Sequence, residues 1–195
     1  QEGITIAADQ FAQNLMADQL NTMILSLVGA IGNNAAVVND VSGGGVLTQS
    51  VLNNTHAKFG DMSQMLTGQI MSGAAYHDLI GEALDNGARL FSSDTVTVVN
   101  ILGKAVIVTD APALTTAGTP NVHNVLSLVS GAGVVSDGSD VITNIDTTNG
   151  KQRIETTMQA DYTFGVGIKG YSWDAANGGN SPSDADLATG TNWDK

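Results

Sequence analysis

Apolar residues near the start of the chain recur at intervals close to four. The positions that share this spacing are Phe11, Leu15, Met16, Leu20, Met23, Leu27 and Ile31. Such a period places them on one face of a helix. We expect Asp9 to cap this helix and the polar run at residues 32–34 to end it, after about 33 Å at 1.5 Å per residue.

The stretch QIMSGAAYHDLIGEAL, residues 69–84, has the pattern of a short apolar strand, a break and a second helix. The break is Ser72-Gly73, and Ser72 is expected to be the N-cap, because its hydroxyl can accept from first-turn amides. Before this stretch, a flexible loop over residues 39–45 leads to a helix beginning at Thr48. Asp61 is expected to cap a further short helix that runs through Leu66.

From residue 95 the pattern changes to strands. Residues 95–102 and 105–109 are separated by Gly103-Lys104, which suits a tight hairpin turn. Further strands are expected at 125–135 with a break at 131–133, and at 141–145, 153–159 and 162–168, with turns at Asp137-Gly138 and Asn149-Gly150 and a short helix begun by Ser183. Helices first and mostly antiparallel strands afterwards predict the α+β class.

Composition and charge restrict the possible functions. The chain of 195 residues has 7 Lys and Arg against 19 Asp and Glu, a formal net charge of -12, and no cysteine. Phosphate binding depends on clustered basic residues, so a nucleic-acid interface is not expected. Disulfides and thiolate metal sites are excluded. The longest apolar run, residues 23–31, is shorter than the roughly 20 residues of a membrane span, so no membrane association is expected.

No catalytic, cofactor-binding or metal-binding residues are predicted, and the chain is expected not to be an enzyme. None of the histidines, His56, His77 and His123, has another ligand at metal-binding spacing. A hydrolase would require Ser72, His77 and an Asp to converge in space, which adjacent helical positions disfavour.

Several other motifs have a structural interpretation. The run Gly165-Val166-Gly167 lies inside a strand pattern and predicts a close backbone approach or a bulge. Residues 137–140 resemble half of a calcium loop but lack its downstream Glu, so a hairpin turn is expected. Trp173 and Trp193 could stack on a sugar or a base, but we expect them to anchor the polar tail.

Five stretches in shared order resemble the major capsid proteins of tailed bacteriophages. They are HAKFGDMSQML (residues 56–66), IMSGAAYHDLIGEAL (70–84), VVNILGKAVIVTDAPAL (98–114), YTFGVGIKGYSWD (162–174) and NSPSDADLATGTNWDK (180–195). The resemblance covers about residues 48–195. One departure is Ser181, which displaces the Pro that usually follows the Asn near position 180.

The resemblance implies the Hong Kong 97-like fold, with a long spine helix, a peripheral sheet and a mixed-sheet axial domain. Residues 1–47 would hold the spine helix and the start of the peripheral domain. Residues 48–160 would be mainly the axial domain, and residues 161–195 would return to the peripheral domain and form the tail. The chain begins at the spine helix, so the N-terminal arm and extended loop are expected to be missing from it.

The function implied is a major capsid protein that self-assembles into an icosahedral shell around double-stranded DNA. Expected partners are copies of itself in pentamers and hexamers, with portal, scaffolding and decoration proteins as further candidates. The shell would be assembled in the host cytoplasm and become part of the virion. A secreted or surface-exposed bacterial adhesin or filament subunit is the alternative, because an acidic, Gly-, Thr- and Asn-rich composition is normal there.

The residues expected to be important for this function are those that hold the fold together, here called scaffold residues. These are Phe11, Leu15 and Met23 on the spine, Tyr76 and Leu79 in the core, and Tyr171 and Trp173 at the return. The loop over residues 110–124 is expected to reach the capsomer axis, where like loops would meet.

Overall fold

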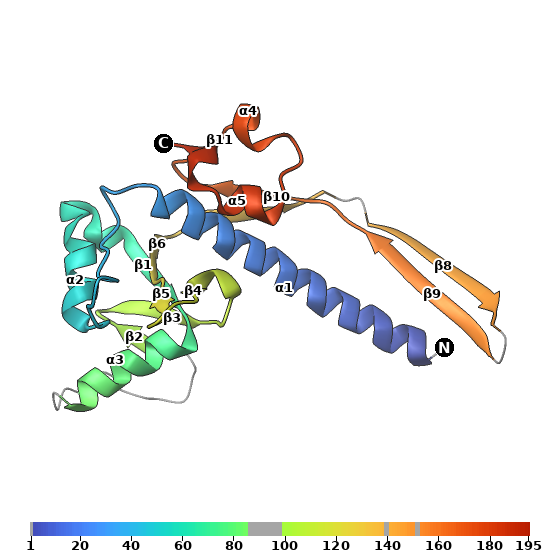
Figure 1. Cartoon of the computed structure of the whole chain (residues 1–195), viewed down its shortest axis with the longest axis horizontal. Helices are drawn as coiled ribbons and strands as arrows, with labels where there is room; N and C mark the ends of the chain where they lie inside the picture. Colours follow the sequence, from blue (N-terminus) through green and yellow to red (C-terminus); the bar gives the residue numbers. More distant parts are fainter. Residues whose placement is uncertain (1, 86–98, 139–140, 151–152) are drawn as a thin grey trace.

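The computed structural model describes residues 2–85, 99–138, 141–150 and 153–195 (Figure 1). Its helices are α1 (Glu2–Gly32), α2 (Gln49–Ala57), η1 (Gly60–Met65), α3 (Gly73–Asp85), η2 (Pro112–Leu114), α4 (Ala175–Gly178), α5 (Asp184–Ala188) and η3 (Gly190–Asn192). Its strands are β1 (Leu66–Met71), β2 (Val99–Ile101), β3 (Lys104–Val108), β4 (Thr115–Thr116), β5 (Val122–His123), β6 (Leu126–Val129), β7 (Gly133–Asp137), β8 (Ile142–Asn149), β9 (Ile154–Asp161), β10 (Phe164–Ile168), β11 (Ser172–Trp173) and β12 (Trp193–Asp194). The combination of helices and several small sheets confirms the α+β class.

Helix α1 is longer than predicted and is packed over only half of its length. It begins at Glu2, so the prediction that Asp9 caps it is wrong: good helix formers such as Ala7 and Ala8 continue the helix through that position. The expected apolar face is also partly wrong, because Met16 and Leu20 are 63% and 49% exposed. The core contacts only the C-terminal half, from about Thr22 onward.

Two hydrophobic clusters form the core. The first joins the C-terminal half of α1 to the C-terminal segment and contains Met23, Ile24, Leu27, Ala30, Ala111, Leu114, Leu126, Ile168, Leu187 and Trp193. The second lies between α2, α3 and the central sheet and contains Leu52, Met71, Ala75, Leu79, Ile101 and Val106.

The central sheet has the strand order β2-β3-β1-β6. Strands β1 and β3 are parallel, with Gln69 opposite Val106, and α3 forms part of the connection between them. The other two pairings are antiparallel. The pairing is only partly covered: Val106 is buried, whereas Ile107 and Val108 at the end of β3 are 56% and 45% exposed.

Of the helix starts predicted at Thr48, Asp61 and Ser183, the first and the last are confirmed. Thr48 accepts from Val51 N–H at 3.2 Å and begins α2, as predicted. Ser183 begins α5 in a capping box with Asp186, also as predicted. Asp61 does not cap a helix: the chain turns at Gly60, with φ 51°, and a 3-10 helix already starts there.

The turn between β2 and β3 is one residue earlier than expected. Ile101 pairs with Lys104, which leaves Leu102 and Gly103 as the two turn residues. Both have positive φ, 54° and 75°, as a type I′ hairpin turn requires. The beginning of the expected strand, residues 95–98, lies outside the described residues, as do positions 139–140 of the hairpin turn expected over residues 137–140.

Strands β8 and β9 form a long two-stranded hairpin that projects from the body beside the N-terminal half of α1 (Figure 1). Its base joins β7 and β10, which pair antiparallel next to α1. A Cβ on Gly165 would lie 2.7 Å from the side-chain Ser136 Oγ and 4.0 Å from Ser136 O. The expected close backbone approach or bulge is therefore not found: the nearest atom is a side-chain hydroxyl, and the register with β7 is continuous.

The C-terminal tail is anchored as expected. Trp173 and Trp193 pair across β11 and β12, with ring centroids 4.9 Å apart and an interplanar angle of 72°. Trp193 is buried and donates from Nε1 to Leu187 O at 3.0 Å. The indoles therefore hold the last residues against α1.

Candidate functional site

A hydrolase site would have to include Ser72, at the break between β1 and α3. In the structure, the polar side chains at this break cap α3. Ala75 N–H donates to Ser72 Oγ at 3.3 Å, and Gly73 N–H donates to the Asp110 carboxylate at 2.9 Å. Two amides of the first helical turn, which have no partner within the helix, are thereby satisfied. Ser72 is the N-cap that the sequence predicted.

The structure brings His123, rather than His77, to Ser72. Ser72 Oγ lies 3.3 Å from His123 Nδ1, and Thr115 Oγ1 lies 3.1 Å from the same nitrogen. His77 is exposed and packs edge-on against Tyr76, so the convergence of Ser72 and His77 that a hydrolase would require is absent. The partner of Ser72 is 51 residues away, and no sequence signal indicated it.

Ser72 is not placed as a nucleophile. It is 3% exposed, and its oxygen already accepts from a backbone amide. His123 shares Nδ1 between two hydroxyl groups, while the nearby Asp110 carboxylate is taken up by Gly73. A base held by an orienting carboxylate is the arrangement that activates serine, and the described contacts of His123 are to hydroxyl groups instead.

A second polar cluster is buried between α2 and the central sheet. His56 Nε2 lies 3.1 Å from Ser127 Oγ and 3.1 Å from Gln69 Nε2. Burial, and secondarily the charge of Lys104, lower the pKa of His56 from its ordinary value. Gln69 is completely buried, and its Oε1 is without a hydrogen-bond partner among the described residues. These contacts fix α2 against β1 and β6.

The described residues contain no group of three or more His, Cys, Asp or Glu side chains that could hold a metal ion. The expectation of no metal, cofactor or catalytic residue remains a prediction.

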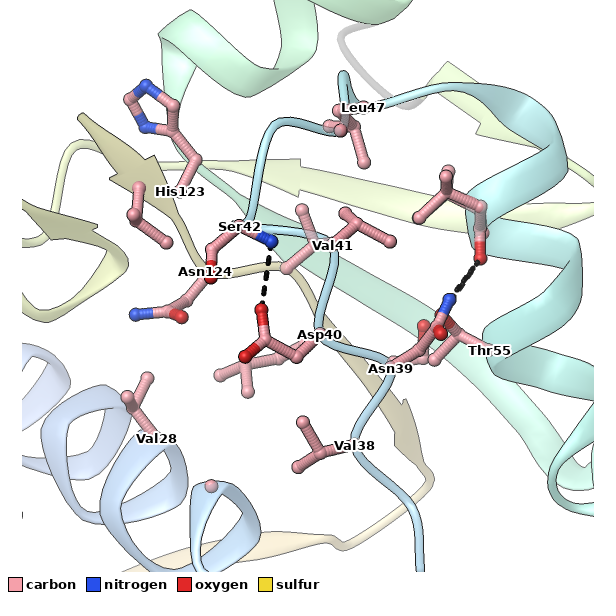
Figure 2. Close-up of a pocket in the computed structure, with 18 of the residues that line it drawn as sticks. Val28, Val38, Asn39, Asp40, Val41, Ser42, Leu47, Thr55, His123 and Asn124 are labelled. Atoms are coloured by element: carbon pink, nitrogen blue, oxygen red, sulfur yellow. Dashed lines mark hydrogen bonds between the residues drawn. The ribbon is translucent and has the colours of Figure 1, made fainter. Parts of the chain in front are cut away.

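A cavity of about 710 Å³ lies between the loop over residues 37–47, the end of α1, α2 and the strands β5 and β6. Figure 2 shows valines, including Val28, Val38 and Val41, around it. Two hydrogen bonds of the loop lie at this cavity. Asn39 donates to Val51 O at 3.2 Å, and Ser42 N–H donates to Asp40 Oδ1 at 2.8 Å (Figure 2).

The hydrogen bonds of this cavity stabilise the loop rather than a reactive group. The hydrogen bonds that Ser42 donates to Asp40 lower the pKa of this exposed carboxyl group, which favours its ionised form. The cavity therefore combines an aliphatic lining with polar groups that brace the loop. Ser127, which also lines it, lies 3.1 Å from His56 Nε2, and Gln69 Nε2 lies 3.1 Å from the same nitrogen.

Large exposed surfaces are the other candidate for function. Every residue of β8 is exposed, and in β9 only Ala160 is partly covered. Cross-strand register separates the two faces of this hairpin. One face, here called the apolar hairpin face, carries Thr143, Ile145, Thr147, Asn149, Ile154, Thr156, Met158 and Ala160. It contains no charged side chain.

The opposite face of the hairpin is polar and acidic. It carries Ile142 at its base and then Asn144, Asp146, Thr148, Glu155, Thr157, Gln159 and Asp161. Alternation of this kind is normal for a sheet with one side against a packed surface and the other against water. Here the apolar side also faces outward: Ile145 is 51% and Ile154 is 70% exposed.

Helix α1 carries a second uncovered apolar surface. Ala12, Met16 and Leu20 continue the row formed by the buried Met23 and Leu27, but they lie beyond the core. We call these three residues the helix stripe. By length and composition Thr5–Gly32 could cross a membrane: an 18-residue window in it has a mean hydropathy of 1.3, but 39% of that window is buried inside the protein. The C-terminal half of α1 is therefore a core helix.

The hairpin is tied to α1 at its base. Tyr162, next to β9, donates from its hydroxyl to Asp18 at 2.9 Å, and its ring lies edge-on to Phe11 at 6.0 Å. The bond to the Asp18 carboxylate raises the pKa of Tyr162.

The predicted scaffold residues have the following positions. Met23 and Leu79 are buried, at 8% and 0% exposure. Phe11, Leu15, Tyr76, Tyr171 and Trp173 are half-buried; Tyr171 accepts from Asn34 Nδ2 at 3.2 Å. The loop over residues 110–124 contains η2 and the small β4–β5 hairpin, with Leu114 completely buried in the first cluster. The amphipathic hairpin is a candidate surface that the sequence analysis did not identify, although the alternation of apolar and polar residues in its strands is visible in the sequence.

Comparison with known proteins gives one family. The model of the family described as Gp13-like, "Major capsid protein 13-like", matches residues 1–195. No curated protein matches the chain.

Proposed function

The chain belongs to the Gp13-like family of major capsid proteins, and from this premise we propose that it forms an icosahedral bacteriophage shell enclosing double-stranded DNA. Membership makes it a structural protein of the virion capsid that self-assembles into a shell. The proposal adds the Hong Kong 97-like fold, the closed icosahedral geometry built from pentamers and hexamers, and the nature of the genome.

The observation that carries this proposal is the amount of structure left uncovered in a single chain. A two-stranded hairpin and about half of a long helix project from the body with apolar side chains in solvent (Figure 1). An isolated hairpin is marginally stable in water. Elements of this kind fit a subunit that buries them against neighbouring copies.

The second hydrophobic cluster lies wholly within residues 48–160, as the proposed axial domain requires, whereas the first also includes Ala111, Leu114 and Leu126 from that range. The spine, α1, packs with β7, β10 and the C-terminal helices, as a peripheral domain would. The second cluster, around Leu79 and the central sheet, would be the core of the axial domain. We keep the boundaries 1–47, 48–160 and 161–195, with the loop over residues 110–124 toward the capsomer axis, as part of the proposal.

The charge of the chain suits a container for DNA. A net charge of -12 repels phosphate, so the inner surface would not trap the packaged genome. The lack of a placed nucleophile at Ser72 supports a protein without catalytic activity. Assembly in the host cytoplasm, and contacts with portal, scaffolding or decoration proteins, belong to the same proposal.

Electron microscopy of the native particle, with mass spectrometry of its main protein band, tests the proposal. We expect closed icosahedral shells whose main band gives peptides of this chain. Filaments built from this chain, or particles in which it is a minor component, would overturn the proposed shell and favour the filament or adhesin alternative.

A further inference from the structure

We propose that the apolar hairpin face of one copy docks on the helix stripe of a second copy. This inference rests on the proposed self-assembly and names the surfaces that would carry part of it. The stripe is Ala12, Met16 and Leu20, and the centre of the hairpin face is the cross-strand pair Ile145 and Met158.

The hairpin face has the properties of a surface that is covered in use. Ile145, Ile154 and Met158 are 51%, 70% and 37% exposed, although they share one face. The other face carries the carboxylates Asp146 and Glu155. Since the polar face is suited to water, the apolar face is the one that a partner would cover.

The helix stripe has the same character. Met16 is 63% and Leu20 is 49% exposed, while Met23 and Leu27, farther along the same row, are 8% and 2% exposed. A continuous apolar row that leaves the core half-way along a helix is complementary in chemistry to the apolar hairpin face.

The stripe cannot be covered by the hairpin of its own chain. Phe11 and Asp18 contact Tyr162, so their side of α1 faces the hairpin base. At 100° per residue, Leu20 is on the opposite side of the helix, about 180° from Phe11, and Met16 is about 140° away. The hairpin lies beside this half of α1 in Figure 1. A second copy is therefore the occupant that the geometry allows.

Charge also favours contact through these two surfaces. Each copy has a net charge of -12, so copies repel each other wherever carboxylates meet. The hairpin face has no charged residue, and Asp18 lies on the far side of α1 from Leu20. Asp9 marks the N-terminal end of the uncharged stripe.

The proposed contact joins two different surfaces, so it is heterologous. Such a contact repeats from copy to copy and generates closed rings or extended arrays. A capsomer requires this type of contact, whereas a self-complementary patch would stop at a dimer.

Disulfide trapping tests the contact directly, because the chain has no cysteine of its own. Leu20→Cys is introduced into one chain and Met158→Cys into a second chain of different mass, and the two are mixed under assembly conditions. The control replaces Met158→Cys by Thr157→Cys, which is on the acidic face. We expect about tenfold more mixed dimer from the first pair, because only thiols in close reach are bridged efficiently.

Other results would overturn the docking. Dimers of Met158→Cys with itself would indicate hairpin stacked on hairpin, and dimers of Leu20→Cys with itself would indicate helix on helix. Equal yields from the test and control pairs would indicate random collision. A single chain carrying both cysteines that closes on itself would show that the contact is intramolecular.

Assembly of the unaltered chain is measured in parallel, which separates the two proposals. If it forms shells but the mixed dimer is absent, the docking is wrong and the shell stands. If it forms no shells, the proposed function fails first. As a second variant, Met158→Asp should prevent shell formation while Thr157→Asp should not, and circular dichroism of both reports whether they fold.

Discussion

The two halves of α1 have similar side chains and different surroundings. In the C-terminal half, Met23 and Leu27 are in the first cluster; in the N-terminal half, Met16 and Leu20 occupy the same row in solvent. The periodicity does not change between them. What changes is the packing around the helix: α5, η2 and η3 cover the C-terminal half. In the N-terminal half Tyr162 contacts the side with Phe11 and Asp18, while Met16 and Leu20 stay exposed. A continuous apolar row can thus serve the core at one end and a partner at the other.

The largest difference in stability between the two halves of α1 is expected when a leucine in each half is replaced by alanine. Leu27→Ala should lower the free energy of unfolding by about 2–5 kcal/mol, because it leaves a cavity in the first cluster. Leu20→Ala, at a half-exposed position, should change it by less than about 0.5 kcal/mol. Denaturant unfolding of the dispersed chain measures both, and equal losses would contradict the separation of packed and uncovered halves.

Two glycines of α1, Gly29 and Gly32, give a second comparison between a packed and an open position of the same helix. A Cβ on Gly29 would lie 2.7 Å from Ala188 O, a backbone atom of α5, so Gly29→Ala should destabilise by about 1–3 kcal/mol. A Cβ on Gly32 meets nothing within 4 Å, and Gly32→Ala should be neutral or slightly stabilising. Thermal unfolding of the two variants checks this; a harmless Gly29→Ala would mean that α5 packs more loosely.

A smaller effect is expected where the hairpin joins α1. Tyr162→Phe removes the hydrogen bond to Asp18 and keeps the ring contact with Phe11. Because the bond is partly exposed, the loss should be no more than about 1 kcal/mol. Amide hydrogen exchange should become faster near residue 161 and stay unchanged in β1. Unchanged exchange at both places would show that this bond does not anchor the hairpin.

Mild acid should lower the free energy of unfolding through His56, and this is the smallest of the effects expected here. The pKa of His56 is lower in the folded chain than its ordinary value of 6.5, so the unfolded chain binds the proton more readily. The stability contributed by neutral His56 is therefore present above pH 6.5 and is lost as the pH falls below it. His56→Gln should reduce this dependence in denaturant unfolding at several pH values, while His77→Gln, at an exposed position, should leave it intact.

Local signals in the sequence predicted much of the fold. Ser72 was recognised as a cap, and Thr48 and Ser183 as the starts of helices, because a side-chain oxygen at the start of an apolar period has a local role. Gly103 marked a hairpin turn, although the pairing of Ile101 with Lys104 moved it by one residue. These features depend on neighbours within a few positions.

Long-range contacts were not predictable in this way. The approach of His123 to Ser72 joins residues 51 positions apart, and no spacing rule connects them. The exposure of Met16 and Leu20 depends on how far along α1 the distant segments pack, which the period of α1 does not reveal. The amphipathic hairpin could have been read from the alternation of Ile154, Thr156 and Met158 with polar residues, but its lack of a partner could not.

Amide hydrogen exchange in the assembled shell and in the dispersed chain compares the two regions most directly. The account predicts that β8, β9 and residues 5–20 of α1 become at least about tenfold slower on assembly, because neighbouring copies cover them. The buried strand β1 and helix α3 should change little. Equal exchange of the hairpin and the N-terminal half of α1 in both states would contradict the claim that these surfaces are made for other copies of the chain.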